Sequence, residues 1–141
     1  MTGLEDIPPQ PLPDYDTETF WEATAEGRLT VCRCQGCRLW LHPPLERCRR
    51  CGGPTDFEDV SGRGSVYSFI VARHPSVPGY LRDLPYVVAL VELEEQVNLR
   101  LTARLEDVDP AGVQVGMPVQ AELRPLPGGS FVVPVFRPMD R

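Results

Sequence analysis

Two pairs of cysteines constrain the fold of this chain more than any other feature of its sequence. Cys34 and Cys37 are separated by two residues, as are Cys48 and Cys51, and ten residues lie between the pairs. A two-residue spacer turns both sulfurs toward one point, so each pair can bind one side of a tetrahedral metal ion. Zinc is favoured over iron because a four-thiolate structural site leaves no open coordination position. We therefore predict a structural zinc (Zn) site in a small cysteine-rich ribbon.

The fifth cysteine, Cys32, precedes the first pair by two residues and lies on a predicted strand over residues 29–33. We expect it to be a strand residue rather than a metal ligand or a nucleophile, because no histidine and acid stand near it in sequence to activate it. His42 lies between the two pairs and could replace a cysteine as a ligand. With four thiols already at suitable spacing, we expect His42 at the surface.

The chain has 14 basic residues, all of them arginine, and 20 acidic residues, which gives a net charge of −6. Residues 1–27 hold seven acids and no base, whereas residues 28–53 hold six arginines and one acid. The ribbon arginines, including Arg47, Arg49 and Arg50, could bind phosphate groups. Alternatively, they could offset the negative charge of a four-thiolate zinc centre. The sequence leaves both interpretations open.

The remaining pattern predicts a mostly β fold in three parts. Residues 1–27 form a proline-rich arm and a short helix that is capped by Asp16 or Thr17 and ends near residue 26. The apolar face of this helix, with Phe20 and Trp21, could dock on the chain's own core or on a partner. Residues 28–56 form the ribbon. Residues 57–141 carry five strands and a C-terminal tail, and five short strands without a long helix favour a closed barrel over a sandwich. The strands are expected over residues 64–73, 85–94, 98–105, 119–124 and 131–136.

Several cellular contexts are disfavoured. The longest apolar run, residues 87–91, is far shorter than the roughly 18 residues that a membrane-spanning helix needs. The first ten residues lack the cationic and apolar regions of a secretory signal. An odd number of cysteines also fits a disulfide framework poorly. We therefore expect a cytoplasmic protein with no membrane segment.

The segment over residues 74–86 joins the first two predicted barrel strands and contains three prolines. It also carries His74, Tyr80, Leu81 and Tyr86. It is either a barrel connection that packs on its own strands or an exposed loop that contacts a partner or an acyl chain.

Motifs over most of the chain, from residue 13 to 138, resemble the family known as domain of unknown function thirty-five, a zinc ribbon followed by an OB-fold barrel. Arg38 stands where the family usually has a glycine after the second cysteine. The resemblance implies that Cys34, Cys37, Cys48 and Cys51 are metal ligands. The motifs that carry it lie at residues 20–29, 34–37, 43–51, 60–69, 84–92, 115–119 and 134–138.

Members of this family accompany thiolase-superfamily enzymes, including lipid-transfer-protein-like aldolases, in steroid and fatty-acid catabolism. The resemblance therefore implies a non-catalytic accessory subunit that supports the assembly of such an enzyme and the path of its acyl-CoA substrate. The sequence itself shows no recognisable nucleophile–base motif and no glycine-rich phosphate loop. The candidate contacts with a partner or ligand are Arg47, Arg49, Arg50, His74, Tyr80, Leu81 and Tyr86.

The alternative function is a nucleic-acid-binding module built from a zinc ribbon and an OB-fold. The net charge of −6 opposes the neutralisation of phosphates on which such binding depends. Strand 98–105 has no aromatic residue on which a base could stack, and strand 85–94 has only Tyr86. Tyr67 and Phe69 are expected to share one face of the first barrel strand, most simply for core packing. We therefore expect a protein partner rather than nucleic acid.

Overall fold

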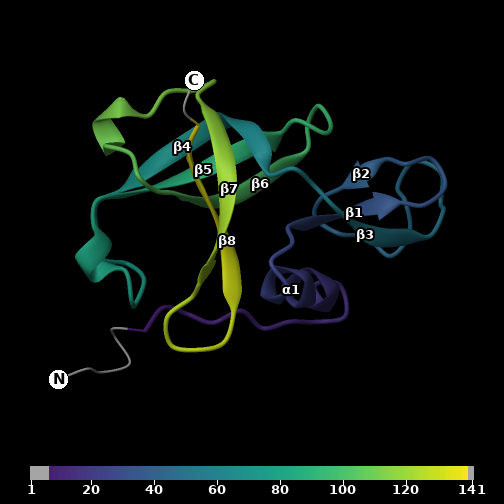
Figure 1. Ribbon diagram of the computed structural model, residues 1–141, viewed down its shortest axis with the longest axis horizontal. Coiled ribbons are helices and arrows are strands. Elements are labelled where there is room, and N and C mark those ends of the chain that lie inside the picture. Colours follow the sequence, from purple (N-terminus) through teal and green to yellow (C-terminus); the bar gives the residue numbers. More distant parts are fainter. Residues whose placement is uncertain (1–6, 140–141) are drawn as a thin grey trace.

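The computed structural model describes residues 7–139, which form a three-stranded ribbon sheet beside a closed five-stranded barrel (Figure 1). The mostly β fold with one short helix, a ribbon and a small barrel is confirmed. Within these residues no helix has the length and hydropathy to cross a membrane. The elements are α1 (Glu18–Ala25), β1 (Thr30–Cys34), β2 (Trp40–Leu41), β3 (Thr55–Asp59), β4 (Arg63–Ala72), β5 (Tyr86–Leu93), β6 (Arg100–Leu105), β7 (Pro118–Pro125) and β8 (Val132–Pro138).

The larger of two cores lies mostly in the barrel, whose strands follow the order β4-β5-β6-β8-β7, and it also includes Leu29, Val31 and Trp40 of the ribbon. Every second side chain of β5, from Val87 to Leu93, is buried, as expected of a strand with one face on a core. Two seams of the barrel are short. β4 pairs with β7 only over residues 63–65, and β6 meets β8 through a single parallel pair, Leu105 with Phe136.

A β-bulge in β4 separates Tyr67 from Phe69, so the prediction that they share one face is wrong. The pairing register with β5 skips Tyr67, and the extra residue reverses the alternation of side chains. Phe69 pairs with the fully buried Ala89 and packs against the core. Tyr67 is 46% exposed, and its ring centroid lies 3.5 Å from Cζ of Arg100.

Helix α1 docks on the chain's own barrel, which resolves the choice that the sequence left open. The ring of Trp21 meets the ring of Phe131, just before β8, edge-on at a centroid distance of 5.6 Å. The residue that caps this end of the helix is Asp14, two positions before the nearer of the two expected caps, Asp16. Asp14 Oδ1 accepts hydrogen bonds from the backbone N–H groups of Asp16 and Thr17, at 3.0 and 2.9 Å. The Thr17 side chain itself caps no helical N–H group.

In the ribbon sheet β1 lies between β2 and β3. Strand β3 spans the expected boundary between residues 56 and 57 and belongs to the ribbon sheet. The turn between β5 and β6 fastens the ribbon to the barrel through Gln96. Its Nε2 donates to the Trp40 carbonyl oxygen at 3.1 Å, and its Oε1 accepts from the Trp40 N–H at 3.0 Å. Both backbone groups of one strand residue are thus held by one side chain.

Candidate metal centre and contact surfaces

The sulfurs of the two cysteine pairs meet at one point, all within 4.8 Å of one another. The Sγ atoms of Cys34 and Cys51 are 3.4 Å apart, and those of Cys37 and Cys48 are 3.6 Å apart. In a tetrahedron with zinc–sulfur bonds of about 2.3 Å, neighbouring sulfurs lie about 3.8 Å apart. The four donors therefore have the number, type and spacing that one zinc ion requires.

Backbone N–H groups point at these sulfurs from both loops. Gly36 and Cys37 each donate to Cys34 Sγ at 3.3 Å. The second pair accepts equivalent bonds from the N–H groups of Arg50 and Gly53, at 3.3 and 3.4 Å. A hydrogen bond to sulfur favours the thiolate, which is the form that binds metal.

The pKa values of the thiols show why a cation belongs at their centre. The N–H of Leu39, with help from the Arg50 side chain, lowers the pKa of Cys37 to about 6. The N–H of Gly53 acts in the same direction on Cys51, but the sulfurs of Cys34 and Cys37 outweigh it and raise the pKa of Cys51 to about 11. Four thiolates so close together repel one another, and a divalent cation removes that conflict.

Arg38 has a left-handed backbone conformation, with φ of 69°, at the position where the family usually has glycine. This region is uncommon for a residue with a side chain. The Arg38 guanidinium forms an ion pair of 2.6 Å with Glu58, which also accepts a 2.9 Å hydrogen bond from Gln35. The bonds from Gln35 and Arg38 lower the pKa of Glu58. The ion pair thus anchors the side chain of this unusual turn residue.

Cys32 lies outside the metal cluster, on β1, as expected. It is 2% exposed, and its Sγ lies 3.6 Å from the carbonyl oxygen of Leu45. His42 is exposed, in agreement with the surface role predicted for it.

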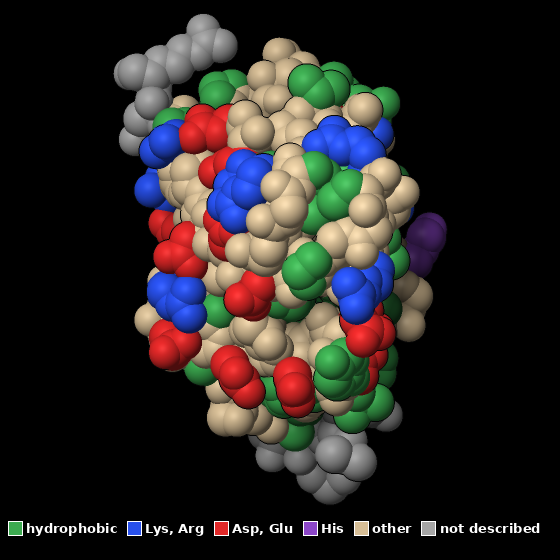
Figure 2. Space-filling model, turned by 90° about the vertical axis from the view of Figure 1, so that its right-hand side faces the viewer, with side chains coloured by type: hydrophobic (Ala, Val, Ile, Leu, Met, Phe, Trp, Pro, Cys, Tyr) green, Lys and Arg blue, Asp and Glu red, His purple; other side chains and the backbone are tan. Residues whose placement is uncertain are grey.

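Strand β3 neutralises half of the ribbon's basic side chains. Arg28 forms an ion pair of 2.7 Å with Asp59, and both Arg33 and Arg38 pair with Glu58. Basic and acidic side chains accordingly lie interspersed on the ribbon end of the molecule (Figure 2). The excess of arginine in residues 28–53 therefore does not make this end one continuous basic surface.

The other three ribbon arginines surround the second cysteine pair, and all are exposed. Within residues 7–139, Arg47, Arg49 and Arg50 form no ion pair with an acid. Arg50 Nη2 donates to the Cys37 carbonyl oxygen at 3.3 Å, and the adjacent Cys37 thiolate raises the pKa of Arg50. Arg50 therefore fits the role of offsetting thiolate charge. Arg47 and Arg49 have neither an acidic partner among the described residues nor a hydrogen bond to a cysteine of the metal centre, and they stay candidates for contact with an anion.

A groove of about 820 Å³ runs between the N-terminal arm, the segment that joins β4 to β5, and the β7–β8 hairpin. Trp21, Tyr80 and Tyr86 contribute aromatic rings to its lining, and the two tyrosine centroids are 5.6 Å apart. The arm is tied to the hairpin by Gln10, whose Nε2 donates to the Pro127 carbonyl oxygen at 2.9 Å. The arm thus forms one wall of the groove.

The arm also touches the β4–β5 segment, at Gly79. This residue has φ of 87°, and a side chain on it would overlap the backbone of Pro8. Glycine is therefore required both for its conformation and for the close approach of the arm.

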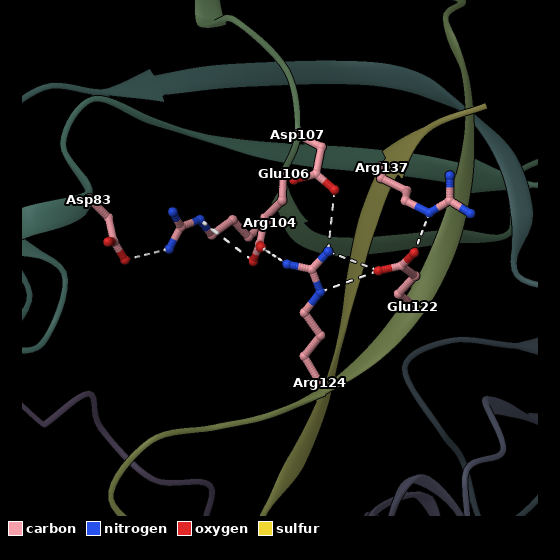
Figure 3. Close-up of polar contacts among 7 residues, drawn as sticks. All are labelled: Asp83, Arg104, Glu106, Asp107, Glu122, Arg124 and Arg137. Carbon is pink, nitrogen blue, oxygen red and sulfur yellow. Dashed lines mark hydrogen bonds and ion pairs between the residues drawn. The ribbon is translucent and has the colours of Figure 1, made fainter. Parts of the chain in front are cut away.

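A network of seven charged residues forms the polar side of the groove and the adjacent barrel wall (Figure 3). Arg104 of β6 holds the β4–β5 segment through a 2.7 Å ion pair with Asp83. Arg124 of β7 binds Glu106 and Glu122 and so bridges strands beside the single β6–β8 pair. The members are Asp83, Arg104, Glu106, Asp107, Glu122, Arg124 and Arg137. Since acids outnumber bases by one, the network does not favour a free anion.

The structure brings only some of the candidate contact residues together. Tyr80 and Tyr86 line the groove. His74 and Leu81 are exposed and lie outside its lining, and Leu81 is 63% exposed. The ribbon arginines lie in a different part of the fold. Sequence reasoning did not place Trp21 in the groove, because its partners across the groove are about 60 to 110 positions away in the sequence.

A four-cysteine ribbon joined to a five-stranded barrel defines a zinc-ribbon and OB-fold protein. Two known domain families match most of the chain and agree with this description. Residues 21–58 match the ChsH2 rubredoxin-like zinc ribbon domain, and residues 57–124 match the ChsH2 C-terminal OB-fold domain. A chain of the solved structure described as "Ltp2-ChsH2(DUF35) aldolase" is 38% identical, with a TM-score of 0.83 over 92% of this chain and 98% of that one. The chain belongs to the DUF35 family, as the resemblance predicted.

Two curated relatives are longer proteins. The probable enoyl-CoA hydratase alpha subunit of Thermomonospora curvata is 40% identical over 132 residues, which are 92% of this chain and 40% of that protein. The 3-oxo-4,17-pregnadiene-20-carboxyl-CoA hydratase alpha subunit of Mycobacterium tuberculosis is 39% identical over 123 residues, 86% of this chain and 38% of that protein. The chain thus spans about two fifths of the length of each.

Proposed function

We propose that this chain is a non-catalytic accessory subunit of a thiolase-superfamily enzyme of the lipid-transfer-protein-like type, which acts on acyl-CoA substrates. The observation that carries the proposal is the likeness, over nearly its whole length, to the ChsH2(DUF35) chain of an aldolase. Relatives named as subunits of CoA-thioester hydratases, one of them for a pregnadiene compound, support steroid or fatty-acid catabolism as the setting. In this role the chain stabilises the enzyme and helps to shape the acyl-CoA path, while the partner performs the reaction.

The metal centre serves this role by fixing the ribbon. We assign Cys34, Cys37, Cys48 and Cys51 as the ligands of one structural zinc ion. Around the metal site, the core contains Leu41 and only three other buried residues, all of them cysteines, so packing contributes little to the stability of this end of the ribbon. The other buried apolar side chains of the ribbon, Leu29, Val31 and Trp40, belong to the barrel core. Zinc binding supplies folding free energy to such small units. Because zinc-bound thiolates must stay reduced, the proposal includes a cytoplasmic location.

Two surfaces are proposed to contact the enzyme or its acyl-CoA. The first consists of the groove tyrosines, Tyr80 and Tyr86, with Leu81 and His74 beside it. Leu81 is an exposed leucine next to an aromatic groove, which is a common feature of protein interfaces. The second consists of Arg47, Arg49 and Arg50, which lack acidic partners among the described residues. Arg47 and Arg49 can meet carboxylates or phosphates of the complex, and Arg50 can do so in addition to offsetting thiolate charge.

Co-expression with the cognate lipid-transfer-protein-like enzyme tests the proposal. We expect a stable complex that survives gel filtration and cleaves its acyl-CoA substrate, with the enzyme less soluble or less active when expressed alone. If the enzyme alone is equally soluble and equally active, the chain is not its accessory subunit.

The contact surface is tested separately with Leu81→Ser. This side chain is 63% exposed, so its replacement leaves the fold intact, and we expect at least a tenfold loss of affinity for the enzyme, the scale of an interface residue worth about 1.4 kcal/mol. Val97→Ser is the matched control, since Val97 is 77% exposed in the turn between β5 and β6. If the two variants bind the enzyme with equal affinity, the surface around Leu81 is not part of the interface. The outcome of the co-expression test does not depend on this result.

A further inference from the structure

The far half of β4 has a free edge. β4 pairs with β5 as far as Ala72 but with β7 only as far as Ser65 (Figure 1). One residue further, the Val66 N–H donates to the Met117 carbonyl oxygen, and the Val66 carbonyl accepts from the Gly116 N–H. Beyond this point only β5 lies beside β4 as a pairing strand.

The pairing pattern identifies the backbone groups on this edge. The N–H of Glu94 bonds toward β4, to Arg63, and that of Leu93 bonds toward β6, to Leu99. Backbone groups alternate in direction along an antiparallel strand, so the even-numbered residues of β5 face β4. Their partners on β4 are Ser68, Ile70 and Ala72.

Phe69 and Val71 therefore direct their N–H and C=O groups away from β5, to the free edge. Neither residue has a hydrogen bond on that side to any part of the chain between residues 7 and 139. Two donors and two acceptors thus stand unpaired, one residue to either side of Ile70.

The side chains do nothing to block this edge. Natural edge strands are commonly protected by charged residues or proline, yet residues 64–72 contain neither, in a chain with a net charge of −6. Ile70 is 64% exposed, although it lies in the middle of a strand. Ser68 and Ala72, its neighbours on the same face, are small and uncharged.

We propose that the β4 edge pairs with the β4 edge of a second copy of this chain, antiparallel, about a two-fold axis through Ile70. In this register Phe69 lies opposite Val71 of the second copy and Val71 lies opposite Phe69. Each such pair exchanges two hydrogen bonds, so all four unpaired groups on each edge are satisfied. The two Ile70 side chains meet at the axis, and Ser68 lies opposite Ala72.

The lack of charge on the β4 edge favours a second copy of this chain as its partner. Two copies of a chain with a net charge of −6 repel each other over most of their surfaces, but the edges that meet here are uncharged. The contact involves about five residues of each chain, so it belongs to the small interfaces, below about 1,200 Å², that associate weakly and reversibly. Dimerisation is therefore expected to depend on concentration.

Sedimentation equilibrium of the zinc-loaded chain, from micromolar to near-millimolar concentration, tests the proposal with Ile70→Lys, Ile70→Glu and the control Val97→Lys. The wild type and the control should approach twice the monomer mass as concentration rises. Each Ile70 variant alone should stay monomeric, because like charges meet at the two-fold axis. An equimolar mixture of the two variants should associate again, because the opposite charges now face each other.

A wild type that stays monomeric throughout, an Ile70→Lys variant that associates like the wild type, or a mixture that fails to associate would each overturn the proposal. Ile70→Lys is also measured for affinity to the lipid-transfer-protein-like enzyme. Unchanged affinity together with lost self-association supports the edge as a homodimer contact. If the wild type never self-associates and Ile70→Lys binds the enzyme more weakly than the wild type does, the edge is a contact with the enzyme. That result overturns pairing with a second copy. The accessory-subunit proposal stands or falls separately, on co-expression.

Discussion

Gln96→Ala should weaken the attachment of the ribbon to the barrel without affecting the metal centre, although Leu29, Val31 and Trp40 still pack in the shared core. The Gln96 amide makes both hydrogen bonds that fasten Trp40, at 3.0 and 3.1 Å, from a turn 56 positions away in the sequence. Trp40 belongs to the two-residue strand β2 and is 6% exposed. When the amide is removed, the Trp40 N–H and C=O lose their partners on the barrel side.

The expected cost follows from these two bonds. A net contribution of about 1 kcal/mol for each bond gives about 2 kcal/mol, and incomplete access of water to the freed Trp40 groups raises the loss toward 3 kcal/mol. That is a large share of the roughly 5–15 kcal/mol by which a domain of this kind is stable. Val97→Ala is the control, because Val97 is the next residue in the same turn and is 77% exposed.

Urea unfolding, followed by circular dichroism, gives the free energy of unfolding for each variant. Amide hydrogen exchange at Trp40 reports the hydrogen bond itself, and it should accelerate in Gln96→Ala but not in Val97→Ala. A loss of stability below about 0.5 kcal/mol, or an unchanged exchange rate at Trp40, would refute the reasoning that this amide joins the two units.

Two further predictions concern the metal and pH. Chelation of zinc, or Cys48→Ser, should abolish stoichiometric zinc in a metal assay and raise amide exchange throughout residues 30–59, with little change in the barrel strands; an equally protected ribbon would contradict the structural role of the metal. Glu122→Gln should destabilise the chain most above the unfolded carboxyl pKa of about 4.3, because hydrogen bonds from Arg124, then Arg137, lower the pKa of folded Glu122. This difference between wild type and variant should shrink as pH falls through the folded pKa, and a difference that does not change with pH would rule out the ionised pair as its source.

Local patterns were sufficient to predict most of the secondary structure and the clustering of the four cysteines. The alternation of Leu99, Leu101 and Ala103 with polar residues places strand β6 within two residues, and the spacing of the cysteines places their sulfurs together. Alternation failed at Tyr67, because a bulge inserts a residue without a sequence signal of its own. It also gave no warning that β3 would belong to the ribbon sheet.

The groove and the charge distribution depend on contacts that are distant in sequence. Arg124 meets Glu106 because strands β6, β7 and β8 converge there, and nothing near either residue predicts the pair. The ribbon arginines form one basic cluster in the sequence, but in the fold Glu58 of β3 neutralises Arg33 and Arg38. Arrangements of this kind follow from the closure of the sheets, which the order of residues alone does not describe.

The central claim is that this chain is an accessory subunit, and a titration of activity tests it most directly. The lipid-transfer-protein-like enzyme is held at fixed concentration, the zinc-loaded chain is added in steps, and cleavage of the acyl-CoA substrate is measured. The account predicts that activity rises and saturates at a fixed stoichiometry of chain to enzyme, while the chain alone has no activity. Full activity of the enzyme before any chain is added, or turnover by the chain alone, would contradict it.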